Sequence, residues 1–306
     1  MLSRLADNLY WMSRYMERAE NTARMLDVQH QASMLPGDPS AADQQWQALL
    51  RLFELESKFL QRHERLEAGR VLVFMVADED NPSSILGVVL APELWECVNS
   101  TWLELRTMLR SPRWRKDPGK ILEWVKFQSH LFRGVMIGTM LKDEAYRFSR
   151  MGTFIERADN TARILDVKFV APRQGSASPG GSADYYFWAS VLRSVSAFEI
   201  YRKVYRDVIT PIRIAELLIQ RADMPRSLLA CLNELLSNLE QVSLNGQSES
   251  IRMAGRMRAD LQYLRVDDAF EPQLHSFLTQ FMFQVDQLGQ LISQEFLVPL
   301  NAPLTS

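Results

Sequence analysis

The chain has 306 residues, of which 47% are hydrophobic and 24% are charged, and its formal net charge is −2. This composition is typical of a globular protein with a substantial core. The lack of a basic surplus argues against a nucleic-acid partner, because phosphate binding depends on positive charge. No apolar run reaches the roughly 18–20 residues that span a bilayer. The two cysteines are too few for a disulfide framework or a zinc site. We therefore expect a cytoplasmic protein that does not associate with a membrane.

Helix signals recur along the chain. Pro118, Pro211 and Pro272 each follow a capping residue and precede apolar residues at three- to four-residue spacing, which is typical of proline in the first helical turn. One β-rich run, residues 71–76, fits either a strand or a buried helix turn. We predict an all-α fold, a multi-helix bundle. The expected helices cover about 3–32, 41–67, 92–110, 118–143, 146–169, 185–208, 211–222, 226–243, 248–263 and 272–297, with boundaries good to several residues.

Two breaks between these helices predict exposed loops, at residues 35–40 and in the Gly/Ser/Pro-rich stretch 171–183. The second could also link two domains. We interpret it as a loop within one bundle, because the helices on both sides carry wide apolar faces that need a shared core. The prediction is a single helical domain over residues 1–306.

The most informative feature is an internal repeat. Residues 17–28, ERAENTARMLDV, recur as residues 156–167, ERADNTARILDV, with ten of twelve positions identical. Agreement of this length indicates a duplication, with pseudo-repeats of roughly 1–145 and 146–306.

At about 100° per residue, each copy of the repeat has an apolar face containing small alanines and an opposite polar face. The polar face carries Glu17, Asn21 and Arg24 in the first copy and Glu156, Asn160 and Arg163 in the second, with Arg18 and Arg157 at its flank. One interpretation is structural, with buried Glu–Arg pairs that fix helix register. The other is a polar pocket where the two motif helices face each other. We favour the pocket, because the polar face is kept between the copies at least as well as the apolar one.

The segment from Tyr10 to Arg24 and the second Glu-Arg copy resemble the alpha-E domain family, named for its helices and its Glu-Arg motif. Residues 81–85, 130–134, 184–188 and 225–227 are also similar to it, so the resemblance covers nearly the whole chain. It implies a role beside circularly permuted ATP-grasp amide ligases, and therefore amide-bond chemistry on peptides or proteins.

The chain departs from the family pattern after residues 81–85. Family members follow this segment with a helix that bears an Ala-Arg-Glu-Asn motif, whereas here Ile85 runs almost directly to Trp95. The resemblance therefore implies that a helix is missing and that the polar pocket is incomplete. We expect a partner to cover the gap through the surface near residues 82–100.

Three functions remain open. The first is a helical partner of an ATP-grasp ligase that holds a peptide or aminoacyl substrate in the Glu/Arg/Asn pocket. The second is an enzyme that uses Glu17 or Glu156 as general acid/base on an amide or ester, with Arg24 or Arg163 stabilising the oxyanion. The third is a non-catalytic scaffold. The substrate-binding candidates are Arg18, Asn21, Arg24, Arg157, Asn160 and Arg163.

We expect no metal and no cofactor. The sequence lacks the Glu-x-x-His pairs of di-iron bundles and the glycine-rich loops that bind nucleotide phosphates. The expected partners are the ligase, a second alpha-E-like chain or a second copy of this chain.

Overall fold

The computed structural model of the chain describes residues 2–34, 39–81, 83–86, 101, 103–170, 182–243, 248–267 and 273–297. These residues form helices joined by turns and contain no strand, which confirms the all-α prediction. The helices are α1 (Leu2–Ser33), α2 (Pro39–Leu52), α3 (Glu56–Leu60), α4 (Ala68–Val76), the 3₁₀ helix η1 (Pro112–Arg115), α7 (Pro118–Thr139), α8 (Glu144–Val170), α9 (Ser182–Ser194), α10 (Phe198–Tyr205), α11 (Pro211–Ile219), α12 (Leu228–Val242), α13 (Glu249–Tyr263) and α14 (Leu274–Phe296).

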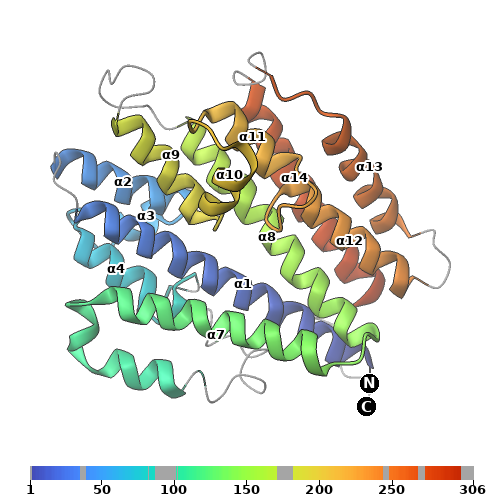
Figure 1. Cartoon of the computed structure of the whole chain (residues 1–306). Helices are drawn as coiled ribbons and strands as arrows, with labels where there is room; N and C mark the ends of the chain where they lie inside the picture. Colours follow the sequence, from blue (N-terminus) through green and yellow to red (C-terminus); the bar gives the residue numbers. More distant parts are fainter. Residues whose placement is uncertain are drawn as a thin grey trace.

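The two motif helices, α1 and α8, form the centre of the molecule and pack on each other more extensively than any other pair (Figure 1). They run in the same direction, because Tyr10 lies beside Gly152 while Met25 and Ile164 line one cavity further along. Helix α7 covers α1, whereas α12 and α14 cover α8. Nearly all buried apolar side chains form one continuous cluster from Ala6 to Leu297.

A glycine allows α1 and α8 to approach closely. A Cβ atom added at Gly152 would lie 2.1 Å from the backbone oxygen of Tyr10, so only glycine fits at this crossing. The motif alanines Ala19, Ala23, Ala158 and Ala162 are buried too, but they lie on the helix faces opposite the Glu-Arg exchange, so they do not mark this contact.

Two long helices of the prediction are each broken in the structure. The expected helix 41–67 ends at Leu52, where Glu54 takes a left-handed conformation (φ 58°), and 61–67 is not helical. The expected helix 185–208 is likewise split at Ser196 (φ 55°). Hydrophobic periodicity continues across both breaks because the pieces bury residues in the same core. The run 71–76 is helical, as part of α4.

The structure tests little of the predicted surface near residues 82–100, because residues 82 and 87–100 lie outside the described part of the chain. Among the described residues on either side of this gap, Ile85 and Leu86 are buried, and residues 103–110 are helical. The loop predicted at 171–183 is also largely outside the described part, as is most of 35–40. Over the described residues, no helix is long and apolar enough to cross a membrane.

Candidate functional site

The two copies of the Glu-Arg motif bind each other reciprocally across the α1–α8 seam. Arg157 donates from Nε and Nη2 to the two carboxylate oxygens of Glu17, at 2.9 Å each. Arg18 donates from Nε and Nη2 to the two oxygens of Glu156, at 2.6 and 3.0 Å. Paired, bidentate bonds of this kind are the strongest that arginine makes to a carboxylate. The motif therefore explains the parallel register of α1 and α8.

Glu17 is surrounded by arginines. Besides Arg157, Arg133 of α7 donates to it at 2.8 Å, and Arg226, two residues before α12, donates at 2.7 Å. These four hydrogen bonds occupy the acceptor positions of the carboxylate. Burial raises the pKa of Glu17, but Arg157, Arg226 and Arg133 together outweigh burial and hold the pKa well below its usual value. Glu17 is therefore a fixed, fully bonded carboxylate.

Glu20, one turn further along α1, shares these arginines. It accepts hydrogen bonds from Arg226 at 2.8 Å, from Ser129 at 3.1 Å, and from Arg24 and Arg133. The Glu17 cluster comprises Glu17, Glu20, Arg24, Arg133, Arg157 and Arg226. Four guanidinium groups thus face two carboxylates, which leaves an excess of two positive charges in a buried place. The Nε atom of Arg24 is buried there without a hydrogen-bond partner.

Glu156 has fewer partners than Glu17 and lines a pocket. It accepts one hydrogen bond from Arg14 at 3.0 Å and two from Arg18. Burial raises its pKa, but Arg18 and Arg14 outweigh burial and lower it overall. The neighbouring cavity, the motif pocket, has a volume of about 150 Å³. It is lined by Arg18, Asn21, Leu52, Phe53, Glu54, Ser83, Glu156, Asp159, Asn160 and Arg163.

Polar groups of both signs face the motif pocket. Arg163 donates to Asp159 at 2.8 Å and to Glu54, the left-handed residue after α2, at 2.6 Å. Burial raises the pKa of Asp159. Asn21 accepts a hydrogen bond from Arg226 through Oδ1 at 3.0 Å, whereas its Nδ2 group is buried without a partner. The wall between the pocket and the Glu17 cluster therefore contains an unused donor.

The duplication is symmetric at the motif and asymmetric around it. Arg133 from α7 and Arg226 from the start of α12 both reach Glu17, while Glu156 receives only Arg14 and Arg18, both from α1. Side chains therefore fill the space around Glu17 in the first copy, whereas a cavity remains beside Glu156 in the second. This difference creates a pocket on one side only.

The structure distributes the predicted site residues between these two places. The motif pocket collects Arg18, Asn21, Glu156, Asn160 and Arg163. Glu17, Arg24 and Arg157 belong to the Glu17 cluster and do not line the pocket. Arg14, Glu54, Arg133 and Arg226 are not among the site residues that the sequence predicts. Three of them lie in segments that carry the family resemblance, 10–24, 130–134 and 225–227, whereas Glu54 has no such signal.

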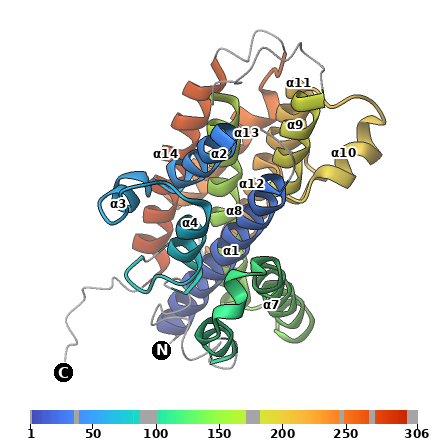
Figure 2. The same ribbon diagram turned by 90° about the vertical axis from the view of Figure 1, so that its left-hand side faces the viewer.

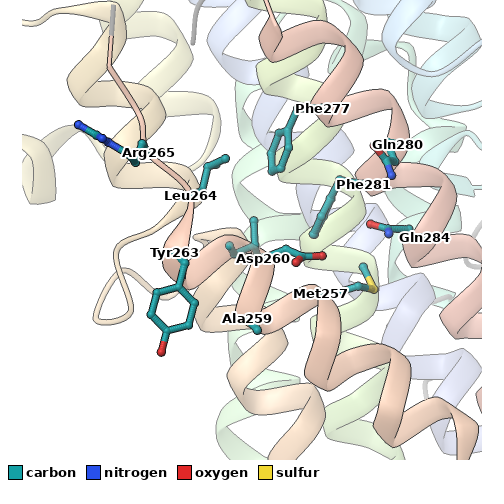
Figure 3. Close-up of a pocket in the computed structure, with 11 residues that line it drawn as sticks. Met257, Ala259, Asp260, Tyr263, Leu264, Arg265, Phe277, Gln280, Phe281 and Gln284 are labelled. Atoms are coloured by element: carbon teal, nitrogen blue, oxygen red, sulfur yellow. The ribbon is translucent and has the colours of Figure 1, made fainter. Parts of the chain in front are cut away.

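A second cavity, of about 560 Å³, lies between α13 and α14 (Figure 3). Phe277 and Phe281 of α14 and Met257 of α13 line it, together with Gln280 and Gln284. It contains none of the predicted site residues. Among the described residues, no group of three or more His, Cys, Asp or Glu side chains is arranged to hold a metal ion.

The fold and the site together define a class of protein: an all-helical domain built around a reciprocal Glu–Arg exchange between two helices. The chain belongs to the Alpha-E family, described as a predicted alpha-helical domain with a conserved ER motif, whose model matches residues 1–297. It is similar to the uncharacterized proteins Rv2567 of Mycobacterium tuberculosis and Mb2597 of Mycobacterium bovis. Each is 23% identical over 289 residues, which cover 85% of this chain and 32% of the relative. The chain thus spans about a third of the length of these relatives. No solved structure matches it.

Proposed function

We propose that the protein is the helical partner of an ATP-grasp amide ligase in a peptide or protein modification system. In this role the motif pocket holds the charged end of a peptide or aminoacyl substrate. The observation that carries the proposal is the unpartnered Nδ2 group of Asn21 at the wall of a pocket that five predicted site residues line. A buried donor without an acceptor costs free energy, and a substrate oxygen would remove that cost.

The charges around the pocket suit a zwitterionic group. The Glu17 cluster places excess positive charge behind Asn21, which favours a substrate carboxylate on that side. Glu54, Glu156 and Asp159 line the pocket and favour an ammonium group. A volume of 150 Å³ equals about five water molecules at ~30 Å³ each. It therefore suits a peptide terminus or one small aminoacyl group and is too small for a nucleotide.

The resemblance of the sequence to proteins that work beside ATP-grasp ligases supports the partner role. The length of the relatives is consistent with it, because most of each relative lies outside the region that matches this chain.

Thermal-shift titration with peptides tests the pocket, because a ligand that binds the native state raises its melting temperature. Free dipeptides should stabilise the protein, and their N-acetylated, C-amidated forms should not. Asn160→Ala should weaken binding about 10- to 100-fold, the effect of losing a hydrogen bond to a charged group. Gln287→Ala, on α14, is the matched control. Equal stabilisation by free and blocked peptides would refute a site for charged ends.

Reconstitution tests the ligase partnership. The protein should co-purify with a co-encoded ATP-grasp ligase, and mass spectrometry should detect a modified peptide only when both chains are present. Asn160→Ala should reduce the product while the complex still forms. Identical products with and without this chain would overturn the partnership.

The alternative of acid–base catalysis is not favoured at Glu17 or Glu156, because both carboxylates have lowered pKa values. Asp159 fits that role better, since burial raises its pKa and it lines the motif pocket. If the protein is itself an enzyme, Asp159→Asn should abolish turnover and weaken peptide binding much less, because Glu54 and Glu156 still line the pocket. A fall in turnover no larger than the fall in binding would argue against this alternative.

A further inference from the structure

Helix α7 exposes an apolar face on the side away from the site. It packs mainly on α1, at the edge of the molecule (Figure 2). Its one arginine between residues 127 and 141, Arg133, points inward to Glu17 and Glu20. The α7 face consists of the exposed residues Phe127, His130, Leu131, Gly134, Val135, Ile137, Gly138, Thr139 and Leu141. It contains no Asp, Glu, Lys or Arg, although 24% of the chain is charged.

The α7 face is the size of one half of a small interface. Five large apolar side chains on it are between 49% and 82% exposed. One of these side chains is aromatic and four are aliphatic, so at about 150 Å² for each fully exposed side chain, the low end of the aromatic range, their exposed parts come to about 450 Å² per molecule. Two copies would bury about 900 Å² from these side chains alone, and the helix backbone at Gly134 and Gly138 with His130 and Thr139 adds to that area toward the roughly 1,200 Å² at which specific interfaces begin. An apolar patch of this size is among the largest that a monomer exposes, and such patches often mark an interaction surface.

Two glycines in the α7 face also indicate a close contact. A Cβ atom at Gly134 or Gly138 would meet nothing within 4 Å, so neither glycine is required by packing inside the molecule. Glycine in a helix interior is destabilising relative to alanine, because it loses more conformational freedom on folding. Their presence is explained if another helix approaches the backbone of α7 at these positions, as small residues permit.

The order of large and small residues makes the α7 face complementary to itself. At 100° per residue, Phe127, Leu131, Gly134 and Gly138 lie within an arc of about 60°, with the large pair first. A two-fold axis beside Gly134 reverses this order in the second copy. Leu131 then enters the gap between Gly134 and Gly138 of the other copy, and Phe127 lies just beyond Gly138. Both contacts occur in one register, as an isologous dimer requires.

We propose that the protein forms a two-fold symmetric homodimer in which the α7 helices of two copies pack antiparallel, with Leu131 of each against Gly134 and Gly138 of the other. A second copy is the occupant because the face supplies its own complement and brings no like charges together. The proposal does not depend on the function of the motif pocket. Arg133 lies on the opposite side of α7 and donates to Glu17. The dimer contact therefore also holds in place the helix that supports Glu17.

Sedimentation velocity on the pure protein tests the dimer. The wild type and Phe283→Glu should be dimers at micromolar concentration. Phe283 is the control because it is 62% exposed, like Phe127, but lies on α14. Leu131→Glu should weaken the dimer at least 100-fold and leave the circular dichroism spectrum unchanged. A wild-type monomer, a dimer that resists Leu131→Glu, or a monomer that associates only with the ligase would overturn the proposal.

Cross-linking tests the register without relying on a disruptive variant. In a Cys97→Ser background, Gly134→Cys should form an intermolecular disulfide under mild oxidation, because the two-fold axis brings this position next to its own copy. Gly255→Cys is the matched control, since Gly255 is also a helical glycine with open space around its Cβ position. A dimer in which Gly134→Cys does not cross-link, or in which Gly255→Cys cross-links equally, would refute this interface.

Discussion

Replacing Glu17 by glutamine should destabilise the protein more than any other conservative change in the motif. Glutamine keeps one oxygen acceptor and replaces the other oxygen with a donor, so the bonds from Arg133 and Arg157 to that oxygen become donor–donor contacts. The Glu17 cluster would then hold four guanidinium groups against the single carboxylate of Glu20. Breaking a buried ion pair on one side costs roughly 3–5 kcal/mol.

This loss should be visible in thermal unfolding. One kcal/mol corresponds to roughly 2–4 °C in domains of 150–250 residues, so we expect Glu17→Gln to lower the melting temperature by about 6–20 °C. Glu156→Gln is the matched comparison, because Glu156 accepts three hydrogen bonds instead of four and borders the motif pocket. It should lower the melting temperature less and weaken peptide binding more.

A double variant checks the mechanism of that loss. Removing Arg226 together with Glu17, as Glu17→Gln/Arg226→Gln, takes away part of the unbalanced positive charge. The double variant should therefore lose less stability than the sum of the two single variants. The shortfall should exceed about 0.5 kcal/mol, as expected for residues in one network. A melting temperature of Glu17→Gln within about 2 °C of wild type would refute the structural role that we assign to the cluster.

Four further experiments test other parts of the structure. Gly152→Ala should cost about 1–3 kcal/mol or more by forcing α1 and α8 apart, whereas Gly255→Ala should be neutral or slightly stabilising in thermal unfolding. The motif glutamates have lowered pKa values, so their stabilisation is present above the unfolded value of 4.5 and lost as the pH falls below it. Asp159 has the opposite effect on the pH dependence of stability. Its pKa is raised, so the free energy of unfolding falls as the pH rises and the side chain ionises. Asp159→Asn should therefore leave unfolding at pH 7 unchanged or improved, and a loss above about 2 kcal/mol would contradict this. Burial raises the pKa of the Cys231 thiol to about 12, so in a Cys97→Ser background iodoacetamide at pH 8 should label Cys231 only after unfolding.

The sequence by itself determined the fold class, the duplication and the pairing of the two motif helices. Apolar residues at helical spacing are a local property, and the repeat of residues 17–28 at 156–167 carries the same faces twice. It also predicted five residues of the motif pocket, because their positions on the helix follow from the periodicity alone. The breaks at Glu54 and Ser196 could not be read in this way, since a left-handed residue leaves the apolar pattern intact.

Only the tertiary structure decided which copy of the motif is filled and which is open. In the sequence Glu17 and Glu156 are equivalent, and nothing local distinguishes them. The difference arises because α7 and the residues before α12 bring Arg133 and Arg226 to Glu17 and leave Glu156 beside a cavity. These arginines are more than 100 positions away from Glu17 along the chain. Helical periodicity relates residues only within a few turns, so contacts of this range depend on how the helices pack.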